Sequence, residues 1–349
     1  MPSSVEKEIT HKSHDGAPIE AYTLRGENGA VARVISYGAT LTKLWMPDRD
    51  GNLADVVLGF DDIAAYTGPH PHFGGIVGRY ANRIARGKFA LDGREYLLDI
   101  NNPPNSLHGG KAGFDRHVWQ AKPATDPSIA AVHFSYKSAD GEEGYPGNLS
   151  VDVTYALTPN NELQIDYAAR TDKPTPINLT NHTYFNFRGA GDVLGHVVQL
   201  NADSYTPVDA TLIPTGEIRS VAGTPLDFRK PVAIGARIAE ISGDPGGYDH
   251  NFIVNGATGT LRCAALVHEP ETGREMEVWT TEPAVQFYSG NFLDGTLSGK
   301  KSATYTKHSG FCLETQHYPD SVHHPNFPNV ILRPGETYKQ TTIYSFSAQ

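Results

Sequence analysis

The chain has 349 residues, a formal net charge of −10 at pH 7 and two cysteines. This charge, with no local cluster of lysine or arginine, argues against nucleic-acid binding. No apolar run is long enough to span a bilayer and residues 1–16 contain no signal peptide, so we expect a cytoplasmic protein without membrane contacts. Cys263 and Cys312 lie far apart in apolar runs and are expected to be buried free thiols.

Predicted strands follow one another along the chain, because apolar residues recur with a period of two. The first is a hairpin over residues 89–98, in which Asp92-Gly93 has the composition of a tight turn. Only residues 61–66 and 233–241 allow a turn or two of helix. Further strands are predicted at 132–136, 151–157, 163–167, 261–267, 276–278 and 338–346, and the second and third of these form a hairpin.

These elements indicate an all-β protein, either a large antiparallel β-sandwich or a barrel-like double sheet. The 35 glycines and 24 prolines are typical of the turns between many short strands. No linker, change of composition or internal repeat divides the chain, so residues 1–349 are predicted to form one domain. Residues 138–147 and 201–231 are expected to be long surface loops that rim a cleft.

Three segments place polar side chains among apolar and aromatic neighbours, and each supplies one titratable group. Two imidazoles and a carboxylate can move protons near neutral pH without a metal or cofactor. The amides and hydroxyls around them recognise a polyol better than an apolar ligand, which points to sugar chemistry. The groups are His108, His182 and Glu314, in the segments Asn105–Gly110, Asn178–Phe187 and Phe311–Asp320.

Each of these residues also has a purely structural interpretation. His182 could be a core histidine bonded to the backbone, although the many amides and hydroxyls in its segment favour a site. Glu314 follows an apolar run, where a carboxylate is costly unless it is paired or used in catalysis. A buried ion pair is therefore the alternative for Glu314, and a surface position in a glycine-rich loop is the alternative for His108.

Two histidine pairs resemble metal-binding motifs but lack the other ligands. His70 and His72, separated by a proline, are similar to the start of a cupin-type site, yet the first glutamate after them is Glu95. His323 and His324 are adjacent and are expected to point apart in an extended segment. Cys-x-x-Cys and His-Glu-x-x-His motifs are missing, so neither a metal nor a cofactor is predicted.

Long blocks of the sequence resemble the signature of the aldose 1-epimerase, or galactose mutarotase, family, and they occur in the order of that family. The resemblance implies a β-sandwich of the galactose mutarotase type, the supersandwich, with an aldose bound in an open cleft on one sheet. The blocks are Gly78–Ala85, Asn105–Gly110, Asn178–Asn186 and Leu313–Asp320, followed by Pro325–Pro328 and Leu332–Glu336.

The resemblance also implies a role for individual residues. Glu314 matches the general base of the family, His182 its general acid, and His108 a second histidine of the site. Arg83 could keep Glu314 ionised or bind hydroxyls. The implied sugar-binding residues are Asn82, Arg83, Asp249, Gln286 and Tyr288, of which the last three lie in shorter blocks.

The chemistry of mutarotation is consistent with these residue types. The C1 hydroxyl of the aldose loses a proton while the ring oxygen gains one, and each positioned group contributes about 10²–10⁴-fold. A carboxylate suits the hydroxyl and an imidazolium suits the ring oxygen. On the residues alone, a glycoside hydrolase that uses Asp249 with Glu314 and a non-catalytic carbohydrate-binding protein stay open. We expect a monomer or dimer, and the preferred aldose depends on loop geometry.

Overall fold

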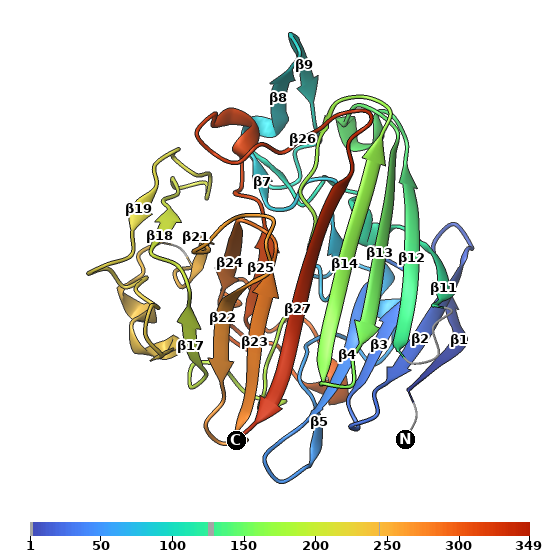
Figure 1. Ribbon diagram of the computed structural model, residues 1–349, viewed down its shortest axis with the longest axis vertical. Coiled ribbons are helices and arrows are strands. Elements are labelled where there is room, and N and C mark those ends of the chain that lie inside the picture. Colours follow the sequence, from blue (N-terminus) through green and yellow to red (C-terminus); the bar gives the residue numbers. More distant parts are fainter. Residues whose placement is uncertain (1–2, 125–128, 244) are drawn as a thin grey trace.

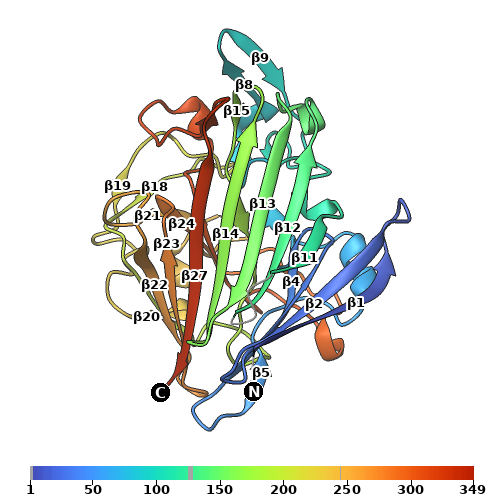
Figure 2. The same ribbon diagram turned by 45° about the vertical axis from the view of Figure 1, so that its right-hand side comes forward.

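The computed structural model describes residues 3–124, 129–243 and 245–349, which form strands, turns and short 3-10 helices but no α-helix. Within these residues the largest sheet has nine strands, in the antiparallel order β11-β12-β13-β14-β27-β23-β22-β17-β20. Figure 1 and Figure 2 show β12, β13, β14 and β27 side by side, with both termini at the same end of the molecule. The strands are β11 Gln120–Pro123, β12 Ala130–Ser138, β13 Leu149–Leu157, β14 Glu162–Thr171, β27 Tyr338–Ala348, β23 Arg274–Thr280, β22 Arg262–His268, β17 Val197–Leu200 and β20 Val232–Ala233.

Two five-stranded sheets accompany the nine-stranded sheet. The N-terminal sheet runs in chain order and consists of β1 Ser4–Lys12, β2 Pro18–Arg25, β3 Val31–Ile35, β4 Thr40–Pro47 and β5 Leu53–Asp55. The site sheet has the order β19-β18-β21-β24-β25. Its strands are β19 Arg219–Ser220, β18 Ser204–Thr206, β21 Asp249–Ile253, β24 Ala284–Tyr288 and β25 Cys312–Gln316.

Short strand pairs and single helical turns connect the sheets. The pairs are β10 Ser106–Leu107 with β7 Arg83–Ile84, β16 Thr180–Asn181 with β6 Ile76–Val77, β15 Thr175–Pro176 with β26 Ile331–Leu332, and β8 Lys88–Leu91 with β9 Arg94–Leu97. The 3-10 helices are η1 Ile63–Thr67, η2 Ala85–Gly87, η3 Phe114–Arg116, η4 Glu142–Gly144, η5 Ile234–Ala236, η6 Ile238–Glu240, η7 Lys300–Ser302 and η8 Ser321–His323. None of the helices in this described part of the chain is long and apolar enough to cross a membrane.

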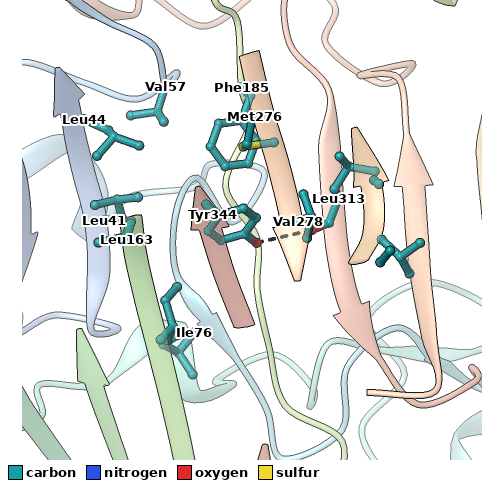
Figure 3. Packing of buried hydrophobic residues seen from close by; sticks show 14 of the residues in the cluster. Leu41, Leu44, Val57, Ile76, Leu163, Phe185, Met276, Val278, Leu313 and Tyr344 are labelled. Atoms are coloured by element: carbon teal, nitrogen blue, oxygen red, sulfur yellow. Dashed lines mark hydrogen bonds between the residues drawn. The ribbon is translucent and has the colours of Figure 1, made fainter. Parts of the chain in front are cut away.

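The main hydrophobic core lies between the nine-stranded sheet and the two smaller sheets. In β13 and β14 every second side chain is buried, because successive residues of a strand point to opposite faces. The same cluster contains Leu41 of the N-terminal sheet, Leu163 of β14 and Leu313 of the site sheet. Figure 3 shows this packing, with the Tyr344 hydroxyl of β27 donating a 3.2 Å hydrogen bond to the carbonyl of Leu313 in β25. The sheet that carries the site is thereby held against the core.

The structure confirms the predicted all-β, antiparallel β-sandwich and both hairpins. Asp92 and Gly93 have φ values of 49° and 80°, as expected of a tight hairpin turn. Of the two segments that allowed helical turns, the first forms η1 and the second forms η5 and η6.

Three smaller expectations need correction. Residues 201–231 are not a plain loop, because they contain β18 and β19. Residues 138–147 are likewise not a plain loop: they contain η4 and wrap the buried Arg79, whose guanidinium donates to the carbonyls of Pro146 and Gly147. Cys312 is buried and free, whereas Cys263 is free but only half-buried.

Candidate active site

The site sheet presents a row of polar side chains on one face. In the strand register, Gln286 of β24 lies between Asn251 of β21 and Glu314 of β25. In the next row, Tyr288 lies between Asp249 and Cys312. The alternating residues of these strands, such as Leu313 and Phe287, belong to the hydrophobic core. Strand pairing therefore aligns the polar side chains on one face of the sheet, while the opposite face is packed into the core.

The pairing of β16 with β6 places His182 beside Glu314. The backbone N–H of His182 donates to Gly75, and its carbonyl accepts from Gly74. Two reciprocal backbone hydrogen bonds between Phe185 and Phe311 then tie this segment to the start of β25. As a result His182 Nε2 lies 3.7 Å from Glu314 Oε1, and both side chains are buried.

The third titratable residue, His108, comes from the end of β10, which pairs with β7. Its Nδ1 accepts a 3.2 Å hydrogen bond from the backbone N–H of Asn82. In the neutral ring the proton therefore lies on Nε2, which becomes a hydrogen-bond donor. The ligand atoms of His108, His182 and Glu314 lie within 4.8 Å of one another, as in a metal site. A protonated Nε2 has no lone pair for a metal, however, and metal-bound histidines normally donate through their other nitrogen.

The three residues share a site cavity of about 250 Å³. Its lining includes every residue predicted for the site except Gln286: these are Asn82, Arg83, His108, His182, Asp249, Tyr288 and Glu314. The remaining lining residues were not predicted from the sequence: they are Pro71, His72, Asn102, Leu107, Tyr184 and Phe292. A larger chamber of about 680 Å³, walled partly by residues 205–226, adjoins it and shares Arg83, Asn102, Asp249 and Phe292.

Gln286 has a supporting position in the structure. Its side-chain amide donates a 2.7 Å hydrogen bond to Asp249 Oδ1, which orients that carboxylate at the edge of the cavity. The Arg83 side chain is held in a similar way, since its Nε donates to Asn102 Oδ1 at 3.0 Å. The hydroxyl of Tyr288 accepts the backbone N–H of Phe292. The polar wall of the cavity is thus organised by hydrogen bonds between its own residues.

Several buried polar atoms on the site sheet have no hydrogen-bond partner. They include Glu314 Oε2, Gln286 Oε1 and Asn251 Oδ1, which belong to one cross-strand row, and both side-chain polar atoms of Gln316 at the end of β25. Buried polar groups are nearly always paired in proteins, and each unpaired one costs about 1–3 kcal/mol. Of these residues Glu314 lines the site cavity, so its unpaired Oε2 is available to a hydroxyl group of a ligand.

Burial controls the charges of the site. It raises the pKa of Glu314 well above its ordinary value, and the nearby Asp249 adds to the rise while Arg83 opposes it. Burial and the neighbouring His72 lower the pKa of His182 to about 3. Burial also lowers the pKa of His108 well below its ordinary value, together with the neighbouring histidines and Arg83. Before a ligand binds, both imidazoles are therefore neutral.

The histidine pairs considered as metal ligands have other partners. His70 Nε2 lies 3.0 Å from the carbonyl of Tyr66, and the ring stacks on Phe73. His323 and His324 do not point apart, because the turn η8 directs both rings to Asp320. A helical turn brings neighbouring side chains to one side, which an extended segment does not.

A polar cavity with a buried carboxylate and two neutral imidazoles, carried by a β-sandwich, defines a class of protein that binds polyols and transfers protons. The sequence model of the family described as aldose 1-epimerase matches residues 20–345. A galactose mutarotase of Bos taurus is 51% identical over 331 residues, which is 94% of each chain. An aldose 1-epimerase of Escherichia coli (strain K12) is 40% identical over 340 residues, covering 96% of this chain and 97% of the relative.

Comparison of the fold with solved structures also points to the aldose 1-epimerase family. The crystal structure of a galactose 1-epimerase from Lactobacillus acidophilus NCFM superposes with a TM-score of 0.88 at 31% identity, covering 99% of both chains. The chain belongs to the aldose 1-epimerase family, and it is an enzyme, an isomerase of aldose sugars. The resemblance and the mutarotase function inferred from the sequence are confirmed, and the hydrolase and pure-binder alternatives are set aside.

Proposed function

We propose that this isomerase interconverts the α and β anomers of an aldohexose such as galactose or glucose, with Glu314 as general base and His182 as general acid. The observation that carries the proposal is the 3.7 Å separation of Glu314 Oε1 and His182 Nε2 in the wall of the site cavity. Both groups can reach the anomeric centre of one pyranose ring. The relatives named galactose mutarotase support the choice of substrate.

The reaction consists of two proton transfers and their reversal. Glu314 takes the proton of the C1 hydroxyl, the C1 carbonyl forms, and the bond between C1 and the ring oxygen breaks. The electron pair of that bond stays on the ring oxygen, which takes a proton from His182. Rotation about the C1–C2 bond presents the other face of the aldehyde, and ring closure returns both protons. No net proton is gained or lost, so the reaction needs no co-reactant.

The carboxylate and the imidazole share one proton in this scheme. Burial raises the pKa of Glu314 and lowers that of His182, so before the sugar binds the carboxyl group holds the shared proton in preference to the imidazole. The reacting form, carboxylate with imidazolium, is reached when the proton moves to His182. Arg83 favours that form because it lowers the pKa of Glu314, and sugar hydroxyls that reach Glu314 Oε2 favour it further. The imidazolium expected from sequence is therefore the reacting form and not the resting one.

The remaining polar groups are proposed to hold the sugar. His108 offers the Nε2–H donor that its tautomer provides. Asp249, oriented by Gln286, accepts from hydroxyl groups, and Arg83 donates to their oxygens. The rings of Tyr288 and Phe292 give the cavity an apolar wall for the carbon face of the sugar.

Polarimetry tests the proposed function directly. The protein is added to freshly dissolved α-D-galactose or α-D-glucose, and the optical rotation is followed to equilibrium against a buffer blank. We expect a faster approach to the same final rotation. A time course equal to the blank would overturn the proposal. Release of new reducing ends from a glycoside would instead indicate a hydrolase, and binding of sugar without acceleration would indicate a binding protein.

A further inference from the structure

A third histidine faces the site cavity. The ring of His72 lies 4.7 Å from the ring of His108 and 5.8 Å from the ring of His182, measured between ring centres. Its side chain is about one-fifth exposed, at 21%, and lines the same cavity. His70, two residues earlier, is turned away from this cavity and accepts the N–H of Phe73. The two histidines of this segment therefore have different roles, and only His72 can reach a bound sugar.

Asp115 holds His72 in a defined tautomer. His72 Nδ1 lies 2.8 Å from Asp115 Oδ2, and the carboxyl group is fully buried. Burial alone would raise the pKa of Asp115, but His72 and Arg116 hold it below its ordinary value, so the group is a carboxylate. A carboxylate accepts the Nδ1–H of the imidazole. In the neutral ring Nε2 then carries a lone pair and is a hydrogen-bond acceptor.

The backbone is adapted to this pair. His72 has a φ of 58°, a left-handed conformation that is uncommon for a residue with a side chain. Gly75 lies against Asp115, since a Cβ atom on this glycine would approach Asp115 Cβ to 2.8 Å. The absence of a side chain at Gly75 thus leaves room for the carboxylate beneath His72.

We propose that His72 is a sugar-binding residue whose Nε2 accepts a hydrogen bond from a hydroxyl of the aldose, and that Asp115 is the positioning residue that keeps this nitrogen an acceptor. The neighbouring His108 is a donor, because the N–H of Asn82 occupies its Nδ1. A hydroxyl group both donates and accepts, so adjacent acceptor and donor imidazoles match it. This inference rests on the proposed function, because it assigns a further contact to the same sugar.

Deoxy sugars test the contact with His72. Mutarotation kinetics are measured with galactose and with its 2-, 3-, 4- and 6-deoxy derivatives, for the wild type and for His72→Phe, which keeps a ring and removes the acceptor. In the wild type we expect one deoxy sugar to lose kcat/KM by roughly 3- to 10-fold through this contact, in line with one hydrogen bond. In His72→Phe the kcat/KM for galactose should fall to that for this one deoxy sugar, so that the enzyme no longer distinguishes the two. The differences in kcat/KM between galactose and the other deoxy sugars should persist.

The control is another histidine–aspartate pair of the chain. His323 Nδ1 lies 2.6 Å from Asp320 Oδ1, but His323 does not line the site cavity. His323→Phe should therefore leave all sugar preferences as in the wild type. His72→Gln, whose side-chain oxygen can act as an acceptor near the position of Nε2, should recover part of the lost preference.

Asp115→Asn tests the positioning role with a different readout. The asparagine amide can donate to His72 Nδ1, which moves the ring proton to Nε2 and converts the acceptor into a donor. We expect KM for galactose to rise with a smaller change in kcat, and no further rise when His72→Phe is added. A His72→Phe enzyme with wild-type preference at every hydroxyl, or additive effects of the two substitutions, would overturn the inference. A wild-type protein without mutarotase activity would instead overturn the proposed function.

Discussion

The nine-stranded sheet and the site sheet bury their strands in different ways. In β13 and β14 buried side chains alternate with partly exposed ones, and the buried ones are almost all apolar. In β24 and β25 every residue is buried, and the buried set includes Gln286, Glu314 and Gln316. The first arrangement gains stability from apolar burial, whereas the second buries polar groups, which is costly until a ligand bonds to them. Stability and chemistry are thus located on different sheets of one core.

The largest expected effect comes from the carboxyl group of the site sheet. Glu314→Gln keeps the shape and removes the proton acceptor, so kcat should fall by about 10²–10⁴-fold with little change in KM. Polarimetric kinetics on galactose measure both constants. Turnover close to that of the wild type would exclude Glu314 as the base.

The same variant should not lose stability. The pKa of Glu314 is raised in the folded protein, so above about pH 4.5 the unfolded chain ionises this group more readily than the folded protein does. The contribution of Glu314 therefore lowers the free energy of unfolding as the pH rises. Glutamine does not ionise, so the variant lacks this loss. Glu314→Gln should therefore be at least as stable as the wild type near neutral pH, as judged by denaturant unfolding.

Substitutions of His182 and His108 should have different kinetic effects. His182→Asn should lower kcat by about 10²–10⁴-fold with a modest change in KM, because its proton matters chiefly in the transition state. His108→Asn should also raise KM, since the Nε2–H donor contacts the ground-state sugar. Steady-state mutarotation of galactose by both variants measures the difference. If His108→Asn lost kcat while His182→Asn only weakened binding, His108 would be the general acid and His182 the sugar-binding residue.

A substitution in the nine-stranded sheet should give the opposite result to Glu314→Gln. Leu163 is fully buried in the main core. Leu163→Ala should lower the free energy of unfolding by about 2–5 kcal/mol and leave kcat unchanged at a temperature where the variant is folded. Urea unfolding and polarimetry provide the two measurements. A large fall in kcat would show that the core of the large sheet also sets the geometry of the site.

Acid should destabilise both regions through buried histidines. The pKa is about 3 for His182 in the site and about 4 for His196, next to the core aromatic Phe187. Because the unfolded chain takes up these protons near pH 6.5, stability should fall as the pH drops below that value. Each group contributes about 1.4 kcal/mol per pH unit until its folded pKa is reached. Replacing either histidine by glutamine should flatten the slope measured by urea unfolding.

The smallest expected effect is that of a chelator. The tautomer of His108 turns a protonated nitrogen to the cavity, and the proposed reaction moves only protons. Prolonged treatment with a metal chelator should leave mutarotase activity intact. Loss of activity that a divalent ion restores would show that the cluster of His108, His182 and Glu314 holds a metal.

Local patterns in the sequence were sufficient to predict strands of the nine-stranded sheet. The period of two in residues 151–167 predicted the β13–β14 hairpin, because side-chain alternation is a property of the strand itself. His182 and Glu314 were also predicted as site residues, because polar groups within apolar runs are costly to bury, and the structure places the two side chains 3.7 Å apart in one cavity wall. The sequence by itself thus determined the strand class and the family, and it predicted the main chemical groups of the site.

Only the tertiary structure decided which groups act together. His72 was dismissed as half of a metal motif, and its partner Asp115 lies 43 residues later and is brought to it by folding. The hydrogen bond by which the Gln286 amide orients Asp249 was not predicted either, because the pairing of β21 with β24 brings the two residues together. The charge state of His182 also depends on burial, which no local pattern reports. Hydrogen-bond partners, tautomers and pKa values are set by neighbours distant in the chain, and the physical reason is that strand pairing, not sequence order, determines those neighbours.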